Sequence, residues 1–376
     1  MNIPIAKPFL GPEEEEAASR AIRSGWVSQG PLVKEFEDRF AEYVGARHAI
    51  ATTSCTTALH SALAMSGIGP GDEVVVPSLS FIATANAVVH AGAVPVFADI
   101  DPETCNVTAE TIQKAITRRT KAVMPVHQMG LPVDLDPIMD LCRKHAFKLI
   151  EDAACAIGSR YRGTRIGGHG NIACFSFHPR KVITTGEGGM ITTDDSDFAG
   201  RLRRFRQHGM SVSDIERHMT DKVIIEQYPE IGYNFRMTDI QAAVGILQLN
   251  RLPVILENRT KIAQFYNKEL GTVRHIKVPK LPEYVYHNFQ SYWIELLPSS
   301  RVSRDVLMQR LLEKGISTRR GIMAIHREAC YSEKGDRSRL LSTERIAKST
   351  VILPLYPSMS SEEQLYVIDS IRESLL

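Results

Sequence analysis

Hydrophobic residues in the first half of the chain come in short β-branched runs that alternate with longer amphipathic stretches. The runs predict strands at His48–Thr52, Glu73–Pro77, Val94–Ala98, Ala122–Val126, Phe147–Glu151, Ile172–Phe177 and Gly189–Thr193. The stretches between several of them have helical periodicity, at Thr56–Met65, Ala83–Ala91, Ala109–Ala115 and Leu135–His145. This alternation predicts an α/β fold with a mostly parallel central sheet and helices on both faces.

The pattern changes in the second half of the chain. A long helix is predicted from Thr238, as its N-cap, to about Arg259, with a kink or break at Pro253. Beyond it the predicted elements are one strand and two helices, at Gln290–Leu297, Ser303–Lys314 and Ser360–Leu375. We therefore expect a large domain at residues 1–250, with its N-terminal segment near the active site, and a smaller C-terminal α/β domain at 251–376.

Composition and charge exclude some classes of protein. The hydrophobic fraction of 43% and the charged fraction of 23% are ordinary for a globular chain, so extensive disorder is not expected. The formal charge is +2, from 45 basic and 43 acidic residues, which is too balanced to indicate a nucleic-acid partner. The short basic run Arg201–Arg206 is predicted to be the solvated face of a helix.

Cysteine spacing and the N-terminus bear on compartment. The 6 cysteines form no CxxC pair and no Cys/His spacing typical of zinc, so we expect free thiols in a reducing compartment and no metal. The first residues lack an apolar core and include four consecutive glutamates, so a signal peptide is not expected. No apolar run approaches the ~20 residues of a membrane helix. The expected location is the cytoplasm.

Candidate chemistry lies where the predicted strands end. Asp152 follows one strand, and Ser176 and Lys181 lie around the end of the next, where ligands bind in such sheets. A lysine and a carboxylate suit pyridoxal 5′-phosphate (PLP), whose aldehyde forms a Schiff base and whose ring nitrogen needs an acidic partner. The Ser54–Thr57 turn offers a helix N-terminus for its phosphate. Singly, each feature also has a structural interpretation, as a surface lysine, a turn aspartate or a helix cap.

Together these motifs resemble a known family. E-D-A-A at 151–154, F-S-F-H-x-x-K at 175–181 and G-E-G-G at 186–189 are similar to the DegT/DnrJ/EryC1/StrS family of PLP-dependent nucleotide-sugar aminotransferases. The resemblance covers nearly the whole chain. It includes S-G-W-V-S-Q-G-P at 24–31, P-S-L-S-F at 77–81, G-Y-N-F-R-M-T-D-I-Q-A-A at 232–243 and L-P-L-Y-P at 353–357. It implies the fold-type I PLP-dependent transferase fold (aspartate aminotransferase-like) and a homodimer with shared active sites.

The resemblance also implies roles for single residues. Lys181 would bind the cofactor covalently and then move a proton, which requires an amine whose pKa is lowered by burial and by the cofactor. Asp152 would pair with the pyridine nitrogen, and Phe81 would stack on the ring. The remaining contacts would be made to the phosphate, by the turn at Ser54, Cys55 and Thr56, by the Ser176 hydroxyl, and by Asn234 of the neighbouring subunit.

Two positions depart from the family pattern. Cys55 stands where the family commonly has Gly or Ala, and Cys155 stands where it commonly has Gln or His near the cofactor's phenolic oxygen. Because a thiol is a poor donor, Cys155 is expected either to weaken that contact or to be an inert buried residue. The candidate substrate-binding residues are Arg319, Arg320 and His326; a pair of solvated arginines and a packed histidine is the alternative. His178 receives no role.

The implied activity is ping-pong transfer of an amino group from L-glutamate to a nucleotide-linked keto-sugar. The string around Asn234 favours a 4-keto-6-deoxy sugar, and the product would enter surface polysaccharide, such as the O-antigen of lipopolysaccharide, or a secondary metabolite. A PLP-dependent sugar dehydratase is one alternative, which Lys181 disfavours because dehydratases of this family carry His there. The other is a non-catalytic regulator that senses a sugar or the cofactor, which the absence of a helix-turn-helix segment disfavours.

Overall fold

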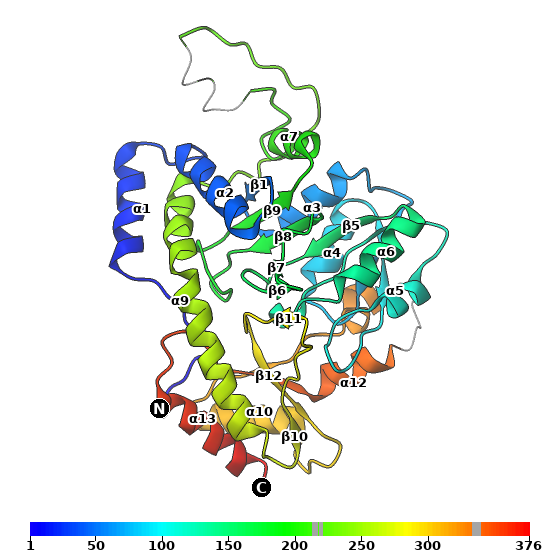
Figure 1. The fold of residues 1–376 in the computed structure, drawn as a ribbon, viewed down its shortest axis with the longest axis vertical. Coiled ribbons are helices and arrows are strands. Elements are labelled where there is room, and N and C mark those ends of the chain that lie inside the picture. Colours follow the sequence, from blue (N-terminus) through cyan, green and yellow to red (C-terminus); the bar gives the residue numbers. More distant parts are fainter. Residues whose placement is uncertain (213–216, 218–220, 333–339) are drawn as a thin grey trace.

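The structure is a computed structural model that describes residues 1–212, 217, 221–332 and 340–376 (Figure 1). Its main sheet has 7 strands in the order β1-β9-β8-β5-β4-β2-β3. Their bounds are β1 His48–Thr52, β2 Glu73–Pro77, β3 Val94–Ala98, β4 Thr120–Val123, β5 Lys148–Asp152, β8 Ile172–Ser176 and β9 Gly189–Thr193. The pairs from β8 to β3 are parallel, and β9 is antiparallel to both neighbours. The predicted mostly parallel α/β sheet is confirmed.

The bounds of β4, β5 and β8 differ by one to three residues from the predicted ones, and two of these differences bear on the site. β4 ends at Val123 rather than Val126, because Pro125 has no N–H to donate to a ladder. β5 includes Asp152, which pairs with Cys174 of β8, so the carboxylate is the last residue of the strand rather than the first residue after it.

Helices cover both faces of the sheet because the strands alternate. Val75 of β2 packs in the cluster of α2 (Pro31–Val44) and α6 (Leu135–His145), while Val74 and Val76 pack in the cluster of α3 (Cys55–Met65), α4 (Ala83–His90) and α7 (Ser196–Phe205). α1 (Pro12–Ser24) and α5 (Ala109–Ala115) complete this part. Many helices begin at a side chain that accepts a first-turn N–H, namely Ser54, Thr108, Asp195, Thr238, Ser303 and Ser360.

A second body surrounds an antiparallel sheet in the order β10-β12-β14-β13. Its strands are β10 Ile276–Lys277, β12 Tyr292–Leu296, β13 Arg319–Arg320 and β14 Thr350–Leu353. Its helices are α10 Arg304–Glu313, η2 Ile325–Arg327, α11 Ala329–Ser332, α12 Leu341–Ser349 and α13 Ser361–Ser374. Ile3 packs in its core, so the first residues of the chain join this C-terminal body. A third sheet, in the order β11-β6-β7, consists of β11 (Val285–Tyr286), β6 (Arg160–Tyr161) and β7 (Thr164–Arg165).

Helix α9 connects the two bodies and corrects one prediction. It runs from Asp239 to Leu270 with Pro253 inside it, so the helix continues well past Arg259. Figure 1 shows it extending from α1 and α2 to α13. The expected domain boundary at residue 250 falls within α9 and stays a prediction. Within the described part of the chain, no helix is long and apolar enough to cross a membrane.

The N-terminal turn of α9 also holds a second segment. Thr238 is the N-cap, as predicted, and its hydroxyl accepts the Gln241 N–H at 3.2 Å. Asp239 is in the first turn of α9. Its carboxylate accepts N–H groups at the start of α2, from Gly30 at 2.7 Å and Val33 at 3.0 Å. The side chain therefore ties α9 to the S-G-W-V-S-Q-G-P segment.

Candidate active site

The carboxyl ends of β5 and β8 bring Asp152 and Lys181 together. Asp152 ends β5, and Lys181 follows β8, the neighbouring parallel strand. Asp152 is only 4% exposed. The charges of the two side chains act on each other, since Lys181 lowers the pKa of Asp152 and Asp152 raises the pKa of Lys181. The two predicted cofactor residues therefore share one site, in which Asp152 is buried and Lys181 is partly buried.

Two donors hold the Asp152 carboxylate. Thr84 of α4 donates its hydroxyl to Oδ2 at 2.8 Å, and the Ala154 N–H donates to Oδ1 at 3.1 Å. Burial raises the pKa of Asp152, and these donors and the Lys181 charge act against that rise without cancelling it. A carboxylate accepts about four hydrogen bonds, so positions remain for a ring N–H.

The Lys181 amine is paired with a thiol. Nζ donates to Cys155 Sγ at 3.1 Å. Burial lowers the pKa of Lys181, but its interactions with Cys155, Cys55 and Asp152 raise it more, so the net direction is upward. Burial alone therefore does not supply the neutral amine that proton transfer requires, and the predicted lowering by burial together with the cofactor stays a prediction. The chain's own groups favour an ammonium at Nζ.

The N-terminus of α3 forms an anion-binding turn. The Ser54 hydroxyl accepts the Thr57 N–H at 3.2 Å, and within the described residues the Cys55 and Thr56 amides have no hydrogen-bond partner. Gly189 passes so close that a Cβ would lie 2.7 Å from Cys55 N. Ser176 is the register partner of Gly189, which puts it one strand from this turn. Free amides at a helix N-terminus suit a phosphate.

A side chain at position 55 is accommodated. Cys55 is not among the positive-φ residues, so it has an ordinary helical backbone and does not need glycine. Its thiol lies 3.6 Å from the Cys174 carbonyl, to which it donates. Burial, followed by the charge of Asp152, raises the pKa of this thiol well above its usual value. Cys55 is therefore a neutral thiol with a free backbone amide.

Phe81 and Asn234 lie at the surface of this subunit. Phe81 is 60% exposed, one turn before Thr84, and is not a core aromatic. Asn234 is exposed, and its backbone bridges to Gln207. The neighbouring Phe235 carbonyl accepts the Thr53 N–H at 3.0 Å. Both side chains are available to groups outside the single chain.

The three candidate substrate residues differ in their surroundings. Arg319 and Arg320 are neighbours on β13, so their side chains lie on opposite faces. Arg320 pairs with Glu328 at 3.2 Å. Arg319 has no ion pair in the described part of the chain, and its charge helps to lower the pKa of Arg180, after burial. Its charge therefore acts on the Arg180–Lys181 segment.

His326 is enclosed rather than presented to a substrate. It is 2% exposed, its Nδ1 lies 2.5 Å from the Ser78 hydroxyl, and its Nε2 lies 3.4 Å from Glu344. The ring therefore joins the C-terminal body to the P-S-L-S-F segment. Near Lys181, burial lowers the pKa of His178, and its Nδ1 accepts the Arg180 N–H at 3.2 Å.

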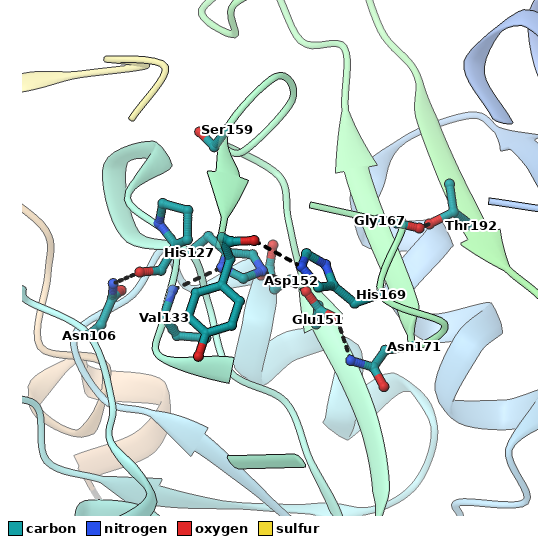
Figure 2. Close-up of polar contacts among 12 residues, drawn as sticks. Asn106, His127, Val133, Glu151, Asp152, Ser159, Gly167, His169, Asn171 and Thr192 are labelled. Carbon is teal, nitrogen blue, oxygen red and sulfur yellow. Dashed lines mark hydrogen bonds and ion pairs between the residues drawn. The ribbon is translucent and has the colours of Figure 1, made fainter. Parts of the chain in front are cut away.

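A buried polar group behind the site was not anticipated (Figure 2). Glu151 precedes Asp152 and therefore lies on the other face of the sheet. His127 Nε2 lies 2.9 Å from its carboxylate and Asn171 donates to it at 2.9 Å. Burial raises the pKa of Glu151, but these contacts lower it more. Because His127 Nδ1 accepts the Val133 N–H at 3.1 Å, the ring proton belongs on Nε2.

The donor set fits PLP. A partly buried lysine, a buried carboxylate with free acceptor positions, an exposed aromatic ring and two unpaired amides at a helix N-terminus are the groups that its aldehyde, nitrogen, ring and phosphate require. The sequence did not predict that Thr84 donates to Asp152 or that Arg180 lies at this site. The only signal for Thr84 was a hydroxyl in the first turn of a helix that follows P-S-L-S-F.

Comparisons with known proteins agree with this site. The sequence profile of the DegT/DnrJ/EryC1/StrS aminotransferase family matches residues 8–372. The aminotransferase TlmJ of Streptoalloteichus hindustanus is 35% identical, with 99% of this chain and 98% of that chain covered and a TM-score of 0.91. DesV of S. venezuelae, solved with a ketimine intermediate, is 32% identical, with the same coverage and a TM-score of 0.91. Spr1654 of Streptococcus pneumoniae, in its PMP form, is 28% identical, covers 99% of both chains and has a TM-score of 0.94.

The chain belongs to the DegT/DnrJ/EryC1/StrS aminotransferase family, a family of PLP-dependent sugar aminotransferases with the fold-type I architecture. Spr1654 has also been solved in a PLP form. The family, the fold class and the cofactor predicted from the sequence are confirmed.

Proposed function

We propose that the protein transfers the amino group of L-glutamate to a nucleotide-linked keto-sugar, at the 4-position of a 4-keto-6-deoxy sugar, for surface polysaccharide such as lipopolysaccharide O-antigen or for a secondary metabolite. The observation that carries the proposal is the pairing of the partly buried Lys181 with the buried Asp152, at the ends of adjacent strands in a chain of this family. A lysine at 181 favours amino transfer over dehydration.

Each group of the site has a task in this reaction. When bound, PLP withdraws electrons from the carbon that carries the transferred nitrogen. Lys181 Nζ would hold the cofactor covalently and, when free, would move a proton between the cofactor carbon and the substrate carbon. Since its partners favour the ammonium, Nζ must first give up a proton. Asp152 accepts the ring N–H and keeps that proton in place.

Phosphate binding and substrate binding use different groups. The turn at Ser54, Cys55 and Thr56, with the Ser176 hydroxyl, holds the cofactor phosphate. Arg319, which has no ion pair in the described part of the chain, binds an oxyanion of the substrate, the diphosphate of the nucleotide or a carboxylate of the donor. Arg320 and His326 already have protein partners and contribute less.

Arg319→Ala is expected to raise KM about tenfold for the substrate whose oxyanion it binds, with kcat largely retained, because one charge-assisted contact is lost. Steady-state kinetics with each substrate varied in turn shows which substrate is affected. Arg320→Ala is the matched control, since its guanidinium is engaged with Glu328. Equal KM values for Arg319→Ala and the unsubstituted enzyme contradict the assignment.

We also propose a homodimer in which Asn234 completes the partner's phosphate site. Apolar side chains in the segment that precedes Asn234 are open to solvent in the single chain; Val223 is 94% exposed and Ile231 is 88% exposed. The described residues between α7 and α9 project away from the body of the subunit (Figure 1). Apolar surface of this kind favours burial against another protein. A second copy of this chain would cover it and bring Asn234 to the neighbouring site.

Subunit complementation tests the shared site. Lys181→Ala and Asn234→Ala are each expected to be impaired as homodimers. Co-refolded together, they form heterodimers in which one of the two sites has neither substitution, so activity returns to about a quarter of the unsubstituted level. The activity of the mixture is compared with that of the separate variants. A mixture no more active than its components contradicts sharing of the site.

Isotope transfer tests the activity itself. The enzyme, loaded with PLP, is incubated with ¹⁵N-labelled L-glutamate and a panel of nucleotide-linked 3-keto and 4-keto sugars. Mass spectrometry and NMR of the products are expected to find ¹⁵N on the former 4-keto carbon. A product that loses a hydroxyl group without gaining ¹⁵N supports the dehydratase alternative, and label at the 3-position contradicts the assignment of the carbon.

A further inference from the structure

Two buried hydroxyls connect the P-S-L-S-F segment to Asp152. Ser80 and Thr84 are each 1% exposed. Their Oγ and Oγ1 atoms lie 2.8 Å apart, and Thr84 Oγ1 lies 2.8 Å from Asp152 Oδ2. Neither hydroxyl has a role so far in binding the cofactor, in binding the substrate or in proton transfer.

The direction of these hydrogen bonds follows from chemistry. An ionised carboxylate only accepts, so the single Thr84 proton points to Asp152. The Ser80 hydroxyl must then donate to Thr84. A threonine in a helix commonly bonds the carbonyl four residues before it, but Thr84 directs its proton out of α4 towards the carboxylate. The order of donation is Ser80 to Thr84 to Asp152.

We call this Ser80–Thr84–Asp152 chain of hydrogen bonds the relay. It is anchored at Ser80, the end away from the carboxylate. The Ser80 N–H donates to the Met323 carbonyl at 3.2 Å, and the Ile325 N–H donates to the Ser78 carbonyl at 2.8 Å. Leu79 also forms a β-bridge with Ala324. The C-terminal body therefore fixes the backbone that orients Ser80, which lies next to Phe81.

The Asp152 carboxylate needs this support because burial opposes its charge. The charged or titratable groups that act on it are Lys181, His127, Cys55 and Cys174. His127 is occupied by Glu151, and Lys181 is assigned to covalent attachment of the cofactor. Within the described residues, Thr84 and the Ala154 N–H are the hydrogen-bond donors to the carboxylate.

We propose that Thr84, oriented by Ser80, is a positioning residue that keeps the Asp152 carboxylate ionised and turned towards the pyridine nitrogen of bound PLP. The proposal rests on the role proposed for Asp152. It gives Ser80 of P-S-L-S-F and Thr84 of α4 a role in keeping the pyridine nitrogen protonated. This role is separate from the proposed stacking of Phe81 on the ring.

The test uses ring-¹⁵N-labelled PLP bound to Thr84→Val, to Thr84→Ser and to the unsubstituted enzyme. Thr84→Val removes the donor and retains the shape of the side chain. It is expected to shift the ring ¹⁵N NMR signal towards the unprotonated position and to weaken PLP binding about tenfold or more, the effect of losing one hydrogen bond to a charged group. Thr84→Ser is expected to restore both readouts.

Thr343→Val is the matched control. The Thr343 hydroxyl donates to Asp99 at 2.7 Å and is fully buried, so its loss removes the same kind of bond outside the site. Its ring ¹⁵N signal and PLP affinity are expected to equal those of the unsubstituted enzyme. If Thr84→Val does not fold, Ser80→Ala leaves Thr84 in place and is expected to shift the signal in the same direction by less.

Three results overturn the proposal. They are an unchanged ring signal in Thr84→Val, an affinity loss without a change in the ring signal, and an equal shift in Thr343→Val. Asp152→Asn separates this proposal from the role of Asp152. If Asp152→Asn shifts the ring signal and Thr84→Val does not, only the relay fails. If Asp152→Asn leaves the signal unchanged, the proposed role of Asp152 fails as well.

Discussion

Lys181→Ala is expected to lower the rate of amino transfer by about four orders of magnitude or more, as loss of an enzyme's covalent nucleophile does. The substitution removes the atom that attaches the cofactor and the atom that moves the proton. Formation of 2-oxoglutarate from L-glutamate, in the presence of the keto-sugar that the isotope experiment identifies, measures the effect.

Lys148→Ala is the control for this substitution. Lys148 is an exposed lysine at the start of β5, the opposite end of the strand from Asp152. Its replacement is expected to leave the rate unchanged, and urea unfolding of both variants shows whether the fold is retained. A Lys181→Ala enzyme that is well folded and keeps more than about a hundredth of the rate contradicts the assignment of nucleophile and proton carrier.

Asp152→Asn is expected to lower kcat about a thousandfold, within the range found when a charge that stabilises a transition state is removed. The amide keeps the shape of the carboxylate but has one acceptor oxygen, which can accept the Ala154 N–H while its NH2 faces the Thr84 hydroxyl, which then accepts rather than donates. The amide cannot hold the ring nitrogen protonated. The expected loss of rate therefore comes mainly from removing the negative charge of the Asp152 carboxylate. Single-turnover rates with L-glutamate measure it directly.

Asp99→Asn is the matched control for the charge. Asp99 follows β3 and accepts hydrogen bonds from Ser342 and Thr343, away from Lys181. Neutralising it is expected to affect stability and not the rate of the donor half-reaction. If Asp152→Asn and Asp99→Asn have equal single-turnover rates, the electrostatic role of Asp152 is wrong.

The positions of Asp152 and Lys181 could be predicted because they depend on local pattern. Alternating apolar residues identify parallel strands, and groups at the carboxyl ends of neighbouring strands meet at one edge. The same alternation separates Glu151 from Asp152, although a one-residue error in the strand end concealed that Asp152 belongs to β5. The free amides of Cys55 and Thr56 follow equally from the cap at Ser54.

Contacts between distant segments could not be predicted in this way. The rotation of α4 about its axis decides that Thr84 points to Asp152, and only packing of the whole sheet sets that angle. The long-range partners of His326 likewise decide that it is a buried link and not a presented side chain. Pro253 predicts a kink or break because propensity is local, whereas α9 continues past Pro253 to Leu270 and packs against both bodies.

The pKa of Lys181 shows the limit of an argument from burial alone. Burial lowers it, as expected, but the direction is set by neighbours that the sequence places 26 residues or more away, such as Cys155. The amine therefore has a thiol partner in this chain.

The visible absorption spectrum of the purified protein with PLP tests the central claim most directly, namely that Lys181 holds PLP and that L-glutamate supplies the amino group. We predict a visible band from the lysine-bound cofactor that is absent from Lys181→Ala, fades on addition of L-glutamate and returns on addition of 2-oxoglutarate. A band that L-glutamate leaves unchanged contradicts the proposed donor. A spectrum identical in Lys181→Ala contradicts the account of the site.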